Sequence, residues 1–324
     1  MACYLGVDGG GSKTAFALVD STGEILARCT APSTYYFRDG IAVVEKVLTQ
    51  GIGDICRQAD IDTAGIDAAF FGLPGYGEAS ADIGQLDAVV GRVLGHDRYS
   101  CDNDMVCGWA GSLATEDGIN VISGTGSMAY GRRQGAGRRV GGWGELFGDE
   151  GSAYWVATQG LNAFSRMSDG RLPRGPLHQL LRGALQIDDD LDAVGVVIEK
   201  WDGNRRDIAA LAATVCAAAQ RGDAQAGRIL ADAADELVAL VETARTALGF
   251  TAQETVALSY SGGMFSDETF LRLFQAAMNR LPVTYDIRRP VLDPAVGAAL
   301  YAAKSSGRPL SPDALHHLMS RSHL

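Results

Sequence analysis

The sequence predicts an α/β protein with two domains. Strand-like runs alternate with helical patterns through the first third of the chain. An apolar strand, a turn of small residues and a second, alternating strand then occur twice, around Gly9–Gly11 and around Gly124–Gly126. A chain of 324 residues with 47% hydrophobic content is long enough for two hydrophobic cores. We therefore expect two related α/β halves.

The first turn lies in GVDGGGSKT (6–14). A P-loop requires G-x-x-x-x-G-K-[ST] and a Rossmann turn requires G-x-G-x-x-G, each leading from a strand into a helix. Neither spacing is present, and TAFALVD (14–20) alternates as a strand does, before the turn at 21–23 and a further strand at 24–28. The stretch therefore predicts strand, glycine turn and strand.

The remaining elements follow from periodicity and turn residues. Helical patterns are predicted over 41–59, 81–95, 107–115, 154–164, 222–250 and 293–304. Strands are predicted over 67–73, 98–101, 119–133 with its central turn, 135–140 and 255–261. Pro294 suits the first turn of the last helix, and Gly249 suits a helix C-terminus. The polar tail after Gly307 is expected to be loosely held.

Composition excludes several classes of protein. The net charge of −11 opposes general nucleic-acid binding. The opening MACYLGVDGG has no basic segment and no long apolar run, and no stretch of about 18 apolar residues occurs. Six scattered cysteines form no C-x-x-C pair, which argues against a zinc site and a disulfide framework. We expect a cytoplasmic protein that is not bound to a membrane.

Three glycine turns close strands and could bind phosphate. They are Gly9–Gly11, Gly124–Gly126 and Gly262–Gly263, and the first two have Ser or Thr neighbours. Without a Cβ, successive backbone N–H groups can approach an anion. Each could also be a simple tight turn, but the repetition favours two hairpins that hold a triphosphate.

Several carboxylates accompany these turns. Asp8 ends the first strand, where a water-mediated Mg²⁺ contact would be natural. Asp104, where a short strand meets a helix, could accept a hydroxyl proton as a general base or could cap the helix. Asp149 in GDEGS has the same ambiguity, and Trp143 among glycines could form a platform for a sugar or pack in the core.

Other charged groups give weaker signals. The five histidines are distant in sequence from the glycine turns. The run DDDLD (188–192) and the Arg-Arg pairs, including 205–206, are interpreted as solvated faces. No G-x-S-x-G nucleophile sequence occurs.

Five segments follow one another along the chain: DGGGSKT (8–14), NDMVCGWAG (103–111), ISGTGS (122–127), GGWGELFGDEGSAYW (141–155) and SGGMF (261–265). In these segments and their order the chain resembles the N-acetylglucosamine kinase/BadF-type branch of the actin–hexokinase–Hsp70 ATPases. The resemblance covers essentially the whole chain, and GGWG-x-x-x-GDEGSAYW is its most specific part.

The resemblance implies two ribonuclease-H-like (actin-like ATPase) domains with ATP in the cleft between them. The domains would comprise 1–116 plus 293–307, and 117–292 with a helical insertion, followed by a tail at 308–324. Asp104 matches the catalytic base, and Asp8 would orient Mg²⁺. The implied nucleotide-binding residues are Gly9, Gly10, Gly11, Ser12, Lys13, Thr14, Gly124, Thr125, Gly126, Ser127, Gly262, Gly263 and Met264. The implied sugar-binding residues are Tyr35, Gly75, Asp104, Gly142, Trp143 and Asp149.

The implied reaction is transfer of the ATP γ-phosphoryl group to the 6-hydroxyl of N-acetylglucosamine or a close amino sugar, by a homodimer. Relatives specific for N-acetylglucosamine carry an Asn-His-Trp-like sequence where this chain has STYYF (33–37). Alternatives are a glucosamine kinase, the ATPase activator of a 2-hydroxyacyl-CoA dehydratase or benzoyl-CoA reductase, and a non-catalytic sugar sensor.

Overall fold

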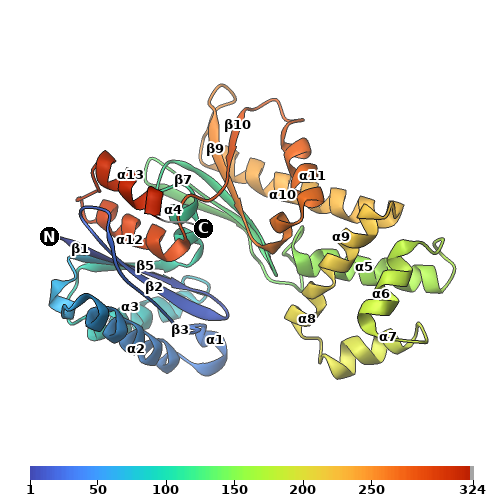
Figure 1. Cartoon of the computed structure of the whole chain (residues 1–324), viewed down its shortest axis with the longest axis horizontal. Coiled ribbons are helices and arrows are strands. Elements are labelled where there is room, and N and C mark those ends of the chain that lie inside the picture. The colour runs from blue at the N-terminus through green and yellow to red at the C-terminus, as the bar shows by residue number, and fades with distance from the viewer. Residues whose placement is uncertain (322–324) are drawn as a thin grey trace. The chain divides into compact units, whose positions relative to one another are not determined.

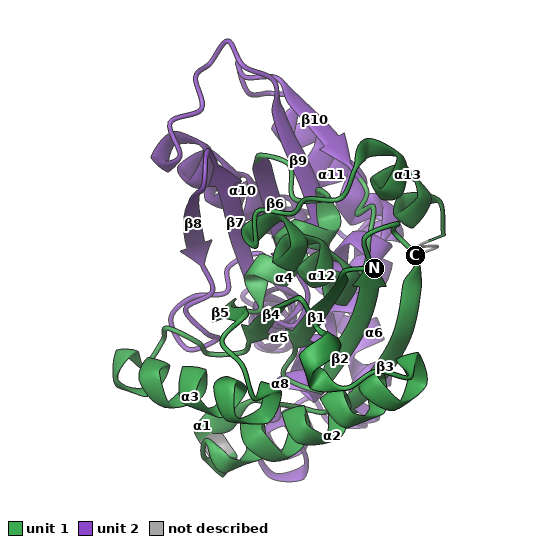
Figure 2. Cartoon of the chain, turned by 90° about the vertical axis from the view of Figure 1, so that its left-hand side faces the viewer, with its two compact units in different colours: residues 1–117, 289–324 green, residues 118–288 purple. Residues whose placement is uncertain are grey.

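The computed structural model describes residues 1–321 and divides into two compact units. Unit 1 comprises Met1–Asp117 and Arg289–Leu324, and unit 2 comprises Gly118–Arg288. Figure 2 colours the two units separately. No helix among the described residues has the length and apolar content needed to cross a membrane.

Unit 1 is a five-stranded sheet with helices on both faces. Its strands are β1 (Cys3–Gly9), β2 (Lys13–Asp20), β3 (Ile25–Pro32), β4 (Ala68–Leu73) and β5 (Tyr99–Asn103). Its helices are α1 (Tyr36–Asp39), α2 (Ala42–Ala59), η1 (Thr63–Gly65), η2 (Ser80–Asp82), α3 (Ile83–Leu94), α4 (Met105–Ser112), α12 (Pro294–Ser305) and α13 (Pro312–Arg321). The strand order is β3-β2-β1-β4-β5, with α2 and α3 on one face and α4 and α12 on the other (Figure 1).

The strand–turn–strand prediction for the opening stretch is confirmed. Strands β1 and β2 pair antiparallel from Cys3↔Asp20 to Gly9↔Thr14, and the Gly10 N–H donates to the Lys13 carbonyl at 2.8 Å. Strands β1, β4 and β5 run parallel to one another, so their carboxyl ends lie at one edge of the sheet. In open α/β sheets this edge is the usual place for ligands.

Helix α12 lies directly on β1 and α4 because glycines remove side chains at both contacts. A Cβ on Gly6 of β1 would overlap the backbone of Ala295 and Ala299. A Cβ on Gly297 would overlap the backbone N and Cα of Gly111 in α4. The C-terminal helix is therefore an integral part of unit 1.

We expect Gly297→Ala to destabilise unit 1, because the new methyl group has only backbone atoms to displace. Such overpacking lowers the free energy of unfolding by about 1–3 kcal/mol. Gly53→Ala in α2 is the matched control, since nothing lies within 4 Å of its Cβ position. It should raise the free energy of unfolding by up to about 1 kcal/mol through helix propensity. Urea unfolding of both variants tests this, and equal midpoints would contradict it.

Unit 2 repeats the strand pattern with a larger helical part. Its strands are β6 (Gly118–Ser123), β7 (Ser127–Arg133), β8 (Ala136–Gly141), β9 (Val256–Ser261) and β10 (Tyr285–Arg288), in the order β10-β9-β6-β7-β8. Its helices are α5 (Ala153–Ser168), α6 (Pro176–Leu185), α7 (Asp192–Val194), η3 (Gly195–Lys200), α8 (Arg205–Ala210), α9 (Ala212–Gln220), α10 (Ala224–Ala247), η4 (Gly263–Ser266) and α11 (Glu268–Met278).

Helix α10 organises the core of unit 2. Its apolar stripe is buried at Ile229, Ala233, Leu237, Val241 and Ala244, and the helix packs on β6, β7 and β8. Gly249 lies just beyond the helix with φ +73°, as expected near a C-terminus.

The tail after Gly307 differs from the expected loose segment. Its residues form α13, in which Ala314 and Leu318 are buried. A Cβ on Gly23 would overlap the Ala314 carbonyl oxygen, so α13 packs on the turn between β2 and β3. The His317 Nε2 lies 2.9 Å from Glu24, and Arg321 forms an ion pair with Glu24 at 3.0 Å.

Candidate active site

The carboxyl ends of β1, β4 and β5 bring together the predicted residues of unit 1. Asp8 pairs with Gly72 across β1 and β4, and Asp104 follows the end of β5. A Cβ on Gly72 would overlap the Cys107 Sγ and lie 3.0 Å from the Asp104 Cα. Glycine at this position therefore lets the β5–α4 junction approach the strand beside Asp8.

Asp104 occupies the N-cap position of α4 without capping the helix. Its backbone is helical, with φ −59° and ψ −22°, and its side chain makes no cap hydrogen bond. The neighbouring Asn103 is buried; its Oδ1 accepts from the Met105 N–H at 3.3 Å and its Nδ2 donates to the Tyr76 carbonyl at 3.3 Å. The alternative role of Asp104 as a helix cap, which its position in the sequence allowed, is therefore excluded.

The environment of Asp8 disfavours its charged form. Burial, followed by the negative charges of Asp104 and Asp293, raises the pKa of Asp8 to about 7. A hydrogen bond from the Cys107 thiol and the Lys13 ammonium act in the opposite direction. A cation placed here would relieve the repulsion among these carboxylates.

This raised pKa predicts how stability depends on pH. Between about pH 4 and 7 the folded protein retains on Asp8 a proton that the unfolded chain releases, so this group makes the protein less stable as pH rises. Asp8→Asn should therefore raise the free energy of unfolding more at pH 8 than at pH 5. Urea unfolding in a metal chelator measures both, and an equal change at the two pH values would contradict the assignment.

The first glycine turn is fixed at its base and open at its tip. The Ser33 hydroxyl donates to the Gly10 carbonyl at 2.7 Å, and a Cβ on Gly9 would lie 2.5 Å from the Thr34 Oγ1. Thr14 is buried, with its hydroxyl 3.3 Å from that of Thr34. By contrast, Gly11, Ser12 and Lys13 are exposed, and the Gly11 Cβ position meets no atom within 4 Å. The tip can accept an anion without displacing protein.

Tyr35 and Gly75 lie on two loops that touch each other in unit 1. Tyr35 is 43% exposed, and its ring packs edge-on to Phe37. Gly75 has φ +83°, and a Cβ there would overlap the Phe37 ring. The Tyr36 hydroxyl also donates to the Gly75 carbonyl at 3.4 Å. The aromatic segment 35–37 and the turn after β4 therefore form one surface.

In unit 2 the second glycine turn is tied to the start of α5. The Gly124 N–H donates to the Gly126 carbonyl at 2.9 Å, and the Ala153 N–H donates to the Gly124 carbonyl at 2.8 Å. The Ser127 hydroxyl donates to the Glu150 carbonyl at 2.6 Å. Thr125, at the tip, accepts at its carbonyl from the Tyr154 N–H at 3.4 Å. The turn is therefore held in one conformation.

The third glycine turn lies against the second. Strands β6 and β9 are parallel, with Ile122 opposite Ser261. Gly262 has φ +103°, and a Cβ there would overlap the Ser123 carbonyl and lie 2.7 Å from the Gly124 nitrogen. Gly263 begins η4, and Met264 is buried beneath it. Only glycine permits this approach.

The segment from Gly141 to Gly151 carries the remaining predicted sugar residues. Trp143 is 71% exposed, which excludes the alternative of a core tryptophan. Gly142 has φ +71°. Asp149 is buried and does not cap α5, because Ser152 fills the N-cap and accepts from the Trp155 N–H at 3.1 Å.

Arg205 forms ion pairs with Asp149 and with Glu145, which the sequence did not predict. The Arg205 side chain remains 38% exposed, so its interpretation as part of a solvated face omitted these two ion pairs. In DDDLD the same interpretation is wrong for Asp190 alone, because Asp188, Asp189 and Asp192 are exposed. Asp190 is almost enclosed and contacts His178 at 2.9 Å and Arg182 at 3.1 Å. A pairing across 56 residues leaves no local sequence signal.

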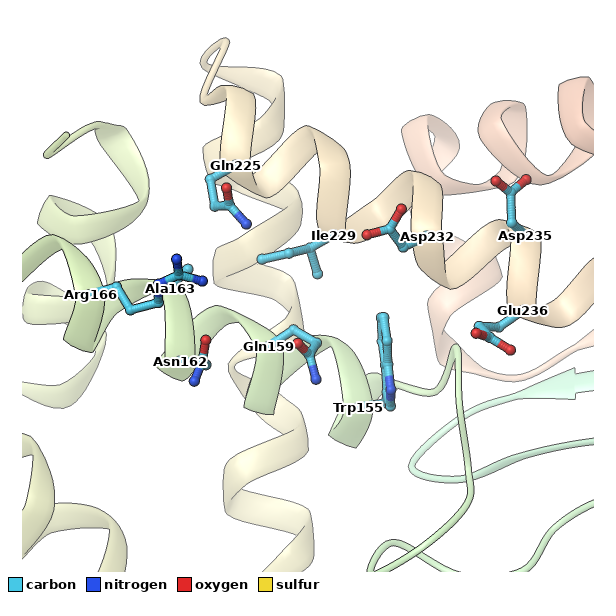
Figure 3. A pocket seen from close by; sticks show the side chains of 10 residues that line it. All are labelled: Trp155, Gln159, Asn162, Ala163, Arg166, Gln225, Ile229, Asp232, Asp235 and Glu236. Atoms are coloured by element: carbon cyan, nitrogen blue, oxygen red, sulfur yellow. The ribbon is translucent and has the colours of Figure 1, made fainter. Parts of the chain in front are cut away.

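A separate pocket of 370 Å³ lies in unit 2 on α5 and α10 (Figure 3). Trp155, Asn162 and Arg166 line it from α5, and Gln225, Asp232 and Glu236 line it from α10. None of the predicted site residues lines this pocket, so we assign it no part in the proposed reaction.

The sequence model of the BadF/BadG/BcrA/BcrD ATPase family matches residues 5–302. The chain belongs to this family. It is 30% identical over 314 residues to the N-acetyl-D-glucosamine kinase of Dictyostelium discoideum, covering 93% of this chain and 98% of the relative. It is 28% identical over 283 residues to the N-acetylmuramic acid/N-acetylglucosamine kinase of Clostridium acetobutylicum, covering 84% and 88%.

Solved structures share the fold. A Chromobacterium violaceum protein, to which N-acetylglucosamine kinase activity has been ascribed, superposes with a TM-score of 0.69 at 23% identity, covering 93% of this chain and 99% of that one. The ROK hexokinase of Thermus thermophilus gives 0.61 at 15% identity, covering 94% and 99%. These likenesses confirm the predicted α/β class with two ribonuclease-H-like domains.

Proposed function

We propose that this family member transfers the γ-phosphoryl group of ATP to the 6-hydroxyl of N-acetylglucosamine or a close amino sugar. The observation that carries the proposal is the placement of Asp8 and Asp104 at the carboxyl ends of β1 and β5, the parallel strands on either side of β4, together with an open glycine turn after β1. The naming of two family relatives as kinases of amino sugars supports the choice of acceptor.

In this proposal both units contribute residues that bind the substrates. Unit 1 contributes Asp104 as the base, Asp8 toward the metal, Tyr35 and Gly75 toward the sugar, and the turn Gly9–Thr14 toward phosphate. Unit 2 contributes the turn Gly124–Ser127 toward phosphate, Gly262–Met264 toward the adenosine, and Gly142, Trp143 and Asp149 toward the sugar.

Phosphoryl transfer needs positioning and charge neutralisation more than covalent help. The Asp104 carboxylate orients the sugar hydroxyl and takes its proton as the oxygen bonds to the γ-phosphorus and ADP leaves. Backbone N–H groups of the turns neutralise charge on the phosphates.

The residues present fit a magnesium ion held chiefly by the nucleotide. Residues 1–321 contain no group of three or more His, Cys, Asp or Glu side chains arranged to hold a metal. Magnesium typically uses one or two carboxylates, water and substrate phosphates, and the repulsion around Asp8 favours a cation there. Bound Mg²⁺ would neutralise charge on the triphosphate.

The test is ADP release with Mg-ATP against N-acetylglucosamine, glucosamine, N-acetylmannosamine, N-acetylmuramic acid and glucose. The proposal predicts turnover that depends on an amino sugar. Because residues 33–37 differ from the Asn-His-Trp-like sequence of relatives specific for N-acetylglucosamine, the most informative comparison is between sugars with and without an acetamido group. ATP hydrolysis that needs no sugar would contradict the proposal and favour an activator ATPase.

The proposal also includes the cellular compartment and the oligomeric state of the protein. The cysteines are all free, which suits a reducing cytoplasm, where ATP is available. We also propose a homodimer, which sedimentation of the purified protein would test.

A further inference from the structure

Arg205 begins α8 in the helical part of unit 2, in a fixed position. The Asn204 side chain caps this helix by accepting from the Arg206 and Asp207 N–H groups, at 2.9 and 3.3 Å. Helix α8 also packs on α5, which starts just after Asp149. The Arg205 side chain thereby reaches the segment Gly141–Gly151.

The Arg205 guanidinium contacts three features of the candidate site. It forms ion pairs with Asp149 and, at 3.3 Å, with Glu145. A Cβ on Gly126 would lie 2.5 Å from its Nη2 and 2.6 Å from the Asp149 Oδ2. Its Nε is buried without a hydrogen-bond partner within the described chain. Arg205, Asp149 and the second glycine turn are therefore in direct contact.

Asp149 is the acceptor at the centre of this arrangement. It is only 3% exposed and has φ +57°, a conformation that a residue with a side chain rarely adopts. Its carboxylate accepts from the Ser127 N–H group, next to the second glycine turn, and from the Gly144 N–H group in the segment Gly141–Gly151, here called the Trp143 loop. Burial raises its pKa, Glu145 adds to this, and Arg205 and the two N–H groups oppose it.

The segment that Asp149 anchors is costly to order. Gly141, Gly142, Gly144 and Gly151 all have positive φ, and no helix or strand is assigned between β8 and α5. Trp143, Leu146 and Phe147 are 71%, 89% and 75% exposed. Glycine-rich backbone loses much conformational entropy on binding unless something orders it beforehand.

We propose that Arg205 is a positioning residue, which holds Glu145, Asp149 and the turn at Gly126 in one arrangement so that the Trp143 loop meets the sugar already ordered. This inference rests on the proposed kinase function. It gives the helical part of unit 2 a role in sugar affinity.

The kinetic test compares Arg205→Gln and Arg205→Lys with Arg206→Gln, a matched control on the next, exposed residue. Arg205→Gln should raise KM for the sugar about tenfold or more, as expected for losing charged hydrogen bonds to a buried carboxylate. The kcat should change much less. Arg205→Lys should recover part of the loss, because an ammonium cannot match the planar fork, and Arg206→Gln should behave as the unmodified chain.

The pH profile separates positioning from a merely structural role. Without Arg205 the pKa of Asp149 rises further, so the fall of kcat/KM for the sugar at acid pH should begin at a higher pH in Arg205→Gln. Equal sugar KM and equal pH profiles in Arg205→Gln and Arg206→Gln would overturn the inference.

A stability cycle keeps the inference testable if no sugar supports turnover. Asp149→Asn, Arg205→Gln and the double variant are compared by urea unfolding. Arg205→Gln alone leaves a buried carboxylate unpaired, so Asp149→Asn should restore part of the lost stability. Additive effects would overturn the contact itself, whereas non-additive effects without sugar turnover would contradict only the kinase function.

Discussion

Asp104→Asn is expected to lower kcat for sugar phosphorylation by about 10²–10⁴-fold, the range typical of losing a general base. The amide keeps the shape of the side chain but cannot take the hydroxyl proton. Because Asp104 makes no cap hydrogen bond and its charge repels that of Asp8, the change should not lower the thermal stability through loss of a helix cap. Steady-state kinetics and thermal unfolding measure the two effects.

Asp97→Asn is the matched control for this prediction. Asp97 is exposed in the same unit, before β5. A kcat for Asp104→Asn that stays close to that of Asp97→Asn would show that Asp104 is not the base.

Gly262→Ala is expected to raise KM for ATP by about 10–100-fold, since overpacking costs roughly 1–3 kcal/mol. The new Cβ would overlap the Ser123 carbonyl, in a backbone conformation with φ +103°. The second and third glycine turns must then separate, which would disturb the proposed phosphate and adenosine contacts together.

If the contact between the two turns serves nucleotide binding, Gly262→Ala should raise KM for ATP more than KM for the sugar. Gly183→Ala in α6 serves as the control, because its Cβ position meets no atom within 4 Å. Equal KM values for ATP in the two variants would mean that the contact between the turns is not used in nucleotide binding.

The parts of the fold that depend on local pattern could be predicted. The hairpin at GVDGGGSKT follows from alternation and glycine, and the buried stripe of α10 follows from helical periodicity. Asp104 could be located because a strand-to-helix junction is visible in the sequence. The chemistry expected of it came from the family resemblance, because the residues alone also allowed a helix cap.

The parts of the fold that depend on contacts between residues distant in sequence could not be predicted. The overlap of Gly262 with Ser123 depends on β9 pairing beside β6, which no local pattern encodes. The pairing of Arg205 with Asp149 depends on how α8 packs on α5, which places Arg205 beside the Trp143 loop. The tail shows the same limit, since a polar sequence gave no sign that Ala314 packs against Gly23.

The most direct measurement is the position of the phosphate on the product made from N-acetylglucosamine and Mg-ATP. Phosphorus–proton coupling in the NMR spectrum of the purified product identifies the phosphorylated carbon. The account predicts coupling to the two protons on carbon 6, with one ADP formed for each sugar phosphorylated. A phosphate at another position, or inorganic phosphate with unmodified sugar, would contradict it.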